Sequence, residues 1–80
     1  MARAIIRYSV DGEGSNVTGN EIRGILEGAG FERFGTASFD AEGQTPHDLV
    51  SALRQVLEKL ESPPGGGELD HLWIYVDQRA

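Results

Sequence analysis

Aspartates at the ends of predicted strands are the residues in this chain best suited to chemistry. Asp11 closes the first apolar segment, and Asp40 and Asp77 end later segments of the same kind. A carboxylate at a strand end can hold a divalent metal, because hard cations prefer oxygen ligands. Asp11 is therefore the candidate ligand for a divalent metal. The alternative is that all three acids are solvated strand ends, since their sequence positions do not show that they converge.

Phosphate binding and nucleophilic catalysis have less support. The loop of residues 12–14 lies between a predicted strand and a predicted helix, where phosphate-binding loops occur. It lacks the usual glycine spacing, and Glu13 would repel a phosphate, so a flexible turn is the better interpretation. Asp70 and His71 are adjacent, but neighbours on a strand face opposite sides. No serine has a Gly-x-Ser-x-Gly context, so no catalytic residue other than Asp11 is a candidate.

The charge balance argues against a nucleic-acid partner. The 80 residues carry 13 acidic and 7 basic side chains, a net charge of −6. Neutralisation of phosphates supplies most of the affinity for nucleic acids, and the basic residues here form no run. Cysteine is absent, which excludes disulfides and thiolate metal sites and suits a cytoplasmic protein. No apolar run approaches the ~20 residues that span a membrane, so no membrane partner is expected.

Alternating apolar residues predict the strands. Residues 3–10 alternate with period two, and residues 69–76 form the last strand. Residues 31–40 are rich in strand formers but are interrupted by Gly35, which indicates a bulge. Residues 31–44 therefore form either one bent strand or two short ones, with residues 41–44 predicted as a turn.

The first predicted helix follows the first strand. Thr18 and Glu21 have the spacing of a capping box, and Gly30 is placed to end the helix in a left-handed conformation. Gly24 and Gly28 lie inside this helix, at a cost of about 1 kcal/mol each relative to alanine. A close approach of another backbone segment would offset that cost.

The second predicted helix has stronger boundary signals. Thr45 is a favourable N-cap, Pro46 suits the first helical position, and Asp48 places an acid in the first turn. The helix must end before Pro63, which begins a Pro- and Gly-rich connection predicted to be flexible. Its apolar face is formed by Leu49, Val50, Leu53, Val56, Leu57 and Leu60.

The order of these elements predicts one α+β domain over residues 1–80. With two strands in residues 31–44, the order is β-α-β-β-α-β, the ferredoxin-like sandwich of two helices on one face of an antiparallel sheet. With one strand it becomes β-α-β-α-β. Because helices cover only one face, Trp73 and Tyr75 of the last strand, with Ile5 of the first, should form an exposed apolar patch. Such a patch on a small protein indicates a protein interface, here a homodimer.

Several segments resemble a known family. They are the first strand (Ala4 to Val10), a helix ending Leu26-Glu27-Gly28-Ala29-Gly30, the stretch from Phe31 to Asp40, and Leu72-Trp73-Ile74-Tyr75. Together they resemble the small CRISPR-associated adaptation proteins and the virulence-associated protein D type endoribonucleases. The resemblance implies a ferredoxin-like fold, a homodimer, and either metal-dependent nuclease activity or a structural role bridging partner proteins. The position of the family's metal-ligating aspartate is Ser9 here, and Asp11 lies two residues further on.

The preferred hypothesis is a small, non-enzymatic homodimeric interaction module, phage- or defence-related, with Ile5, Trp73 and Tyr75 in its interface and a further protein as its partner. It requires no cofactor. One alternative is a metal-dependent endoribonuclease using Asp11 and Mg²⁺. A second alternative is a regulatory domain that binds a small ligand, because ferredoxin-like domains host many functions.

Overall fold

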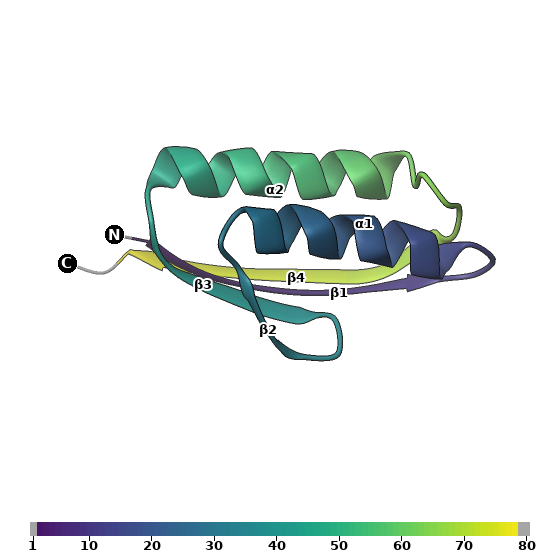
Figure 1. Ribbon diagram of the computed structural model, residues 1–80, viewed down its shortest axis with the longest axis horizontal. Coiled ribbons are helices and arrows are strands. Elements are labelled where there is room, and N and C mark those ends of the chain that lie inside the picture. Colours follow the sequence, from purple (N-terminus) through teal and green to yellow (C-terminus); the bar gives the residue numbers. More distant parts are fainter. Residues whose placement is uncertain (1, 79–80) are drawn as a thin grey trace.

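The chain forms a four-stranded antiparallel sheet with two helices. The computed structural model describes residues 2–78, and one of the seven basic residues, Arg79, lies outside them. In chain order the elements are β1 (Ala2–Asp11), α1 (Ser15–Gly28), β2 (Glu32–Gly35), β3 (Ser38–Gln44), α2 (Pro46–Glu61) and β4 (Glu68–Gln78). The strands lie in the order β2-β3-β1-β4. The predicted α+β class and the β-α-β-β-α-β order are confirmed (Figure 1).

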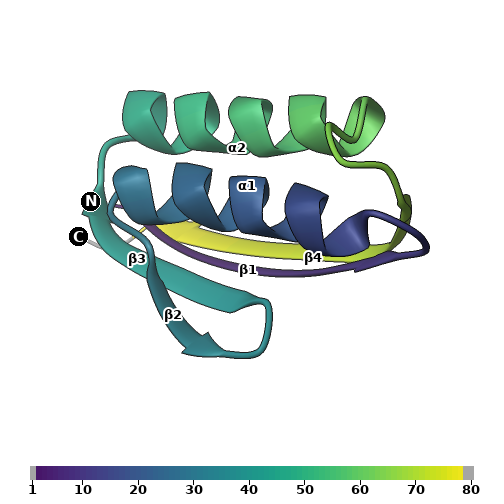
Figure 2. The same cartoon turned by 45° about the vertical axis from the view of Figure 1, so that its right-hand side comes forward.

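Both helices cover the same face of the sheet, as the two views in Figures 1 and 2 show. Alternate residues of β1 point into this layer and are buried: Ala2, Ala4, Ile6 and Tyr8. Ile22 and Leu26 of α1 and Leu49, Ala52 and Val56 of α2 pack onto them from above. Every second residue of the strand and every third or fourth residue of the helices are therefore buried in the same core. No helix among residues 2–78 is long and apolar enough to cross a membrane.

Residues 31–44 form two strands. Residues 36 and 37 make the turn between β2 and β3, and Ala37 adopts a φ of 54° there. The pairing register shifts between Arg33 and Gly35, which agrees with the predicted irregularity at Gly35. The prediction of a turn at residues 41–44 is wrong, because these residues continue β3, with Ala41 opposite Ala4 and Gln44 opposite Ala2. Pairing with β1 outweighs the weak local strand preference of this segment.

The predicted N-cap of α1 is also wrong. The helix begins at Ser15, one turn earlier, after Gly14 in the left-handed conformation, and no side chain caps it. Thr18 lies within the helix and is fully buried. Its hydroxyl donates to the Gly66 carbonyl oxygen at 2.8 Å and accepts from the Gly65 backbone N–H at 3.2 Å. The threonine thus links α1 to the α2–β4 loop.

Two glycine-rich loops that the sequence predicts as flexible pack against each other at this point. A Cβ atom on Gly14 would overlap the Gly65 carbonyl, and one on Gly65 would meet Val17 at 2.3 Å. Glycine is needed here because the two backbones are in direct contact. This contact sets where β4 begins relative to α1.

The C-terminal end of α1 follows the prediction. Gly30 has a φ of 94°, its N–H donates to the Glu27 carbonyl at 3.1 Å, and the Phe31 N–H donates to the Leu26 carbonyl at 2.9 Å. These two bonds form a Schellman motif. The close backbone approach expected at Gly24 and Gly28 is absent: within the described part of the chain, no packing neighbour lies within 4 Å of a Cβ built on either glycine.

Helix α2 confirms its predicted start. The Thr45 side chain accepts a hydrogen bond from the Asp48 backbone N–H at 3.1 Å, and Pro46 occupies the first helical position. The helix ends at Glu61, before Pro63.

Candidate functional site

Strand β4 is a free edge of the sheet. It is 11 residues long and pairs on one side only, with β1. The register with β1 is regular from Ala2 opposite Gln78 to Ser9 opposite His71, and shifts only beyond that point. The stretch Leu72–Val76 contains no charge and no proline. Alternate backbone N–H and C=O groups along the outer side of Leu72–Val76 therefore have no strand partner among residues 2–78 and could pair with another strand.

The face of β4 turned away from the helices carries the predicted apolar patch. Trp73 is 49% exposed and Tyr75 is 42% exposed, and their rings stack at 6.2 Å between centroids. Ile5 lies directly opposite Tyr75 on β1 and is half-buried. The Tyr75 hydroxyl donates to Asp77 Oδ2 at 3.0 Å. The structure thus brings together the three residues that the sequence analysis assigned to an interface.

The helix side of the same edge is also apolar. Leu72 and Ile74 are half-buried, and Val76 is 46% exposed. Helix α2 contacts α1 on one flank, and on its opposite flank Val50 and Leu57 are 51% and 47% exposed. A groove of about 330 Å³ runs along that second flank. Helix α1 contacts β1 and β2, whereas α2 contacts β1, so the flank of α2 turned away from α1 lies on the side of β4.

The aspartates do not assemble into a metal site. Asp11 is exposed at the end of β1, opposite Glu68. Asp40 lies opposite Ile5 and Asp77 lies opposite Arg3, which are six and eight residues from Asp11 along β1. At about 3.3 Å per residue, these carboxylates are about 20 and 26 Å from Asp11 along the strand. Among residues 2–78, no group of three or more His, Cys, Asp or Glu side chains could hold a metal ion.

Asp70 and His71 do make contact, contrary to the sequence analysis. His71 Nδ1 lies 3.2 Å from Asp70 Oδ2. The register shift between Ser9 and Val10 disturbs the strict alternation of side chains at this point of β4. Ser9 lies opposite His71, but the structure describes no hydrogen bond between the two. The His71 and Asp70 side chains are 59% and 52% exposed, so solvent competes with any proton transfer through them.

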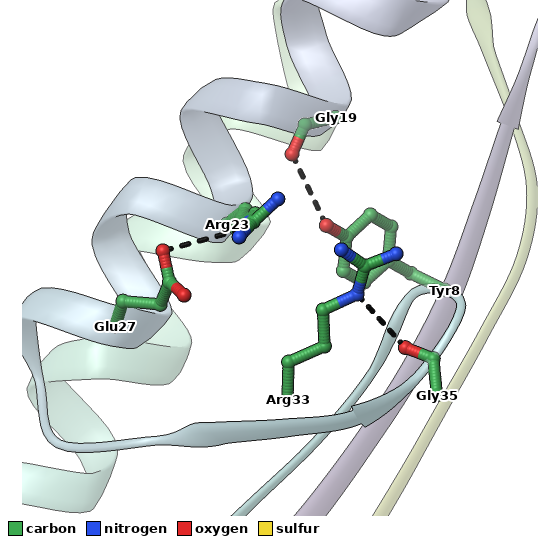
Figure 3. Close-up of polar contacts among 6 residues, drawn as sticks. All are labelled: Tyr8, Gly19, Arg23, Glu27, Arg33 and Gly35. Atoms are coloured by element: carbon green, nitrogen blue, oxygen red, sulfur yellow. Dashed lines mark hydrogen bonds and ion pairs between the residues drawn. The ribbon is translucent and has the colours of Figure 1, made fainter.

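A second surface, on the opposite flank of the sheet, was missed by sequence reasoning. Arg23 of α1 and Arg33 of β2 both point toward Tyr8 of β1 (Figure 3). Tyr8 is almost completely buried, and its hydroxyl donates to the Gly19 carbonyl at 3.1 Å. Burial raises the pKa of Tyr8, while the positive charges of Arg23 and Arg33 act in the opposite direction. The two arginines are ten residues apart in the sequence and belong to different elements, so no local pattern reveals their approach.

Comparisons with known proteins returned no similar family, curated protein or solved structure. The resemblance to CRISPR-associated adaptation proteins and virulence-associated endoribonucleases therefore stays a prediction. The functional argument depends on the geometry of the chain itself.

Proposed function

We propose that this protein is a homodimeric interaction module whose two copies pair through β4. Antiparallel pairing of the two free edges joins two four-stranded sheets into one continuous sheet, with all four helices on the same face. The observation that carries the proposal is the uncharged stretch Leu72–Val76, exposed at an edge with apolar groups on both sides. Soluble proteins rarely leave such an edge open, because it pairs readily with other chains.

The sequence of β4 is self-complementary about Ile74. In a two-fold antiparallel pair centred there, Trp73 lies opposite the partner's Tyr75, and Leu72 lies opposite the partner's Val76. His71 then lies opposite the partner's Asp77, so an imidazole ring faces a carboxylate. Centring the pair on Tyr75 would instead place Asp77 against the partner's Trp73. Of these two registers, the one centred on Ile74 therefore keeps apolar groups opposite apolar groups.

This dimer does not bring the two copies of Asp11 together. Asp11 lies on β1, opposite Glu68, and Glu68 is six residues from Ile74 along β4. The two-fold axis doubles this offset, so the carboxylates lie about 40 Å apart along the strand direction. The proposed dimer thus supports a structural role, such as bridging partner proteins. It gives no support to a metal-dependent nuclease site at the dimer interface.

The absence of cysteine allows a direct test of the register. In the proposed dimer, only residue 74 faces its own copy across the two-fold axis. Directly opposed residues have Cα atoms about 4.5–5.5 Å apart, which fits a disulfide. We expect Ile74→Cys to form an intermolecular disulfide under mild oxidation, which non-reducing electrophoresis would show as a dimer. Phe34→Cys, on the β2 edge, is the control and should run as a monomer on the same gel.

The oligomeric state of the unmodified chain provides the second test. Sedimentation equilibrium over a concentration series should show a monomer–dimer equilibrium. A strict monomer at millimolar concentration would overturn the proposal. Cross-linking of Trp73→Cys or Tyr75→Cys in preference to Ile74→Cys would contradict the register centred on Ile74.

A further inference from the structure

A cleft of about 320 Å³ opens between α1, the end of β1 and the β2–β3 hairpin, and no residue of β4 lines it. Twelve residues line it. None of them is an aspartate or glutamate, although the chain has 13 acidic residues, and two of them are arginines. The cleft therefore gathers two basic side chains in a protein of net charge −6.

The two arginines are held in place at their Nε atoms. Arg33 Nε donates to the Gly35 carbonyl oxygen at 3.0 Å, and Arg23 Nε donates to Glu27 Oε1 at 3.3 Å (Figure 3). A guanidinium group has five N–H donors, so these bonds use one donor of each arginine. Glu27 is not among the lining residues, and its contact positions Arg23 from outside the cleft. The remaining N–H groups are on the terminal nitrogens of the two guanidinium groups, which point toward Tyr8.

Neutral polar groups complete the wall. Ser15, Asn16 and Asn20 of α1 and Thr36 of the β2–β3 turn also line the cleft. The turn itself is held against β1, because the Tyr8 N–H donates to the Ala37 carbonyl at 3.2 Å. Hydroxyl and amide side chains can bind the hydroxyl groups of a ligand next to its charged end. The site thus has a cationic part and a neutral hydrogen-bonding part.

We propose that this cleft binds a small organic phosphate, with Arg23 and Arg33 holding the phosphate group. Both guanidinium groups border the same cleft, and the planar guanidinium fork matches phosphate oxygens. A phosphate monoester carries about −1.5 to −2 charges at pH 7 and three acceptor oxygens, so it can bind both guanidinium groups although Glu27 offsets part of the Arg23 charge. The acidic remainder of the surface disfavours a long polyanion such as RNA.

The cleft has room for more than a phosphate group. A volume of about 320 Å³ is at the lower end of the range for small-molecule sites, which indicates an organic part the size of a sugar. Ribose 5-phosphate is therefore the probe of choice, with ribose as the neutral control and inorganic phosphate as the control without an organic part.

Titration of the ¹⁵N-labelled protein with each probe tests the proposal by NMR. Ribose 5-phosphate should shift the amide signals of Gly19, Asn20 and Ala37 and leave those of β4 unchanged. Arg23→Gln and Arg33→Gln should each weaken binding by about tenfold or more, since a hydrogen bond to a charged group is lost with its charge. Arg33→Lys should have an intermediate effect, because it keeps the charge but loses the fork.

Arg54→Gln is the matched control, because Arg54 is an exposed arginine on the far flank of α2. It should bind ribose 5-phosphate as the unmodified protein does. Circular dichroism of each variant distinguishes lost binding from lost folding. Equal binding of ribose and ribose 5-phosphate, equal weakening in Arg54→Gln, or no localised shift at millimolar ligand would overturn the proposal. Binding of a phosphoserine peptide without binding of ribose 5-phosphate would also overturn it.

Discussion

The two edges of the sheet are built in opposite ways. Strand β2 has four residues, all exposed, with charged Glu32 and Arg33 and a register shift before Gly35. Strand β4 has 11 residues, and its central stretch has regular pairing and no charge. Short length, charge and irregular pairing are the devices that prevent edge-to-edge association. The chain uses all three at β2 and none of them in the centre of β4, so the two edges differ in their availability to another strand.

The side chains around the two edges also differ in chemical character. Beside β2, the cleft carries the basic side chains Arg23 and Arg33. Beside β4, the exposed groups are apolar on both faces, with Trp73 and Tyr75 on one and Val50 and Leu57 on the other. A cleft with two arginines favours a small anionic ligand, whereas an edge with exposed apolar groups favours another protein surface. The molecule therefore separates its two proposed binding roles onto opposite flanks.

The largest expected effect comes from placing charge on the β4 edge. Trp73→Lys combined with Tyr75→Lys puts like charges opposite each other twice in the dimer, and should raise its dissociation constant by more than about a hundredfold. Phe34→Lys, which changes an aromatic residue that is 59% exposed on β2, should leave the dissociation constant unchanged. Sedimentation equilibrium measures both. Similar behaviour of the two variants would remove the distinction between the edges.

The next effect concerns the anchor at the start of β4. Thr18→Val removes a buried hydroxyl that bonds Gly65 and Gly66, so it should lower the free energy of unfolding by about 1–3 kcal/mol. Thr36→Val, at the exposed turn beside β2, should change it by less than about 0.5 kcal/mol. Urea denaturation gives both values. Equal stability of the two variants would show that the hydroxyl contacts of Thr18 do not anchor the loop.

A smaller change is expected in α1, which lies between the two edges. Gly24→Ala should raise the free energy of unfolding by about 0.5–1 kcal/mol, because no packing neighbour among the described residues occupies the Cβ position and alanine favours the helix. Gly65→Ala provides the contrast: its Cβ would collide with Val17, so it should be destabilising. Thermal denaturation distinguishes the two. A destabilising Gly24→Ala would point to a packing role for that glycine.

The smallest effect tests the charged pair of the dimer. His71→Asp places an acid opposite the partner's Asp77 and should weaken dimerisation by a few-fold, the range of exposed ion pairs. His71→Lys should retain or slightly strengthen it. The difference between these variants should shrink as salt is added, because exposed charges are screened. A salt-independent difference would argue against direct pairing of these residues.

Sequence patterns were most informative where the cause of a structure is local. The Thr45 cap, Pro46 and the apolar stripe predicted the start of α2, and the alternation in residues 3–10 predicted which side of β1 is buried. Thr18 shows the limit of this reasoning. Its spacing to Glu21 fits a capping box, yet its hydroxyl bonds a loop 47 and 48 residues away. A buried tertiary contact outweighed the local signal.

The sequence by itself determined the two helices, the first and last strands and the apolar character of Ile5, Trp73 and Tyr75, but left open whether residues 31–44 form one strand or two. Only the tertiary structure decided that β4 lies at an edge, that Asp11 is remote from Asp40 and Asp77, and that Arg23 and Arg33 share a cleft. The physical reason is the sequence separation of the residues that interact. Periodicity and caps depend on neighbours within a few residues, whereas strand order and converging charges depend on which distant segments share one core.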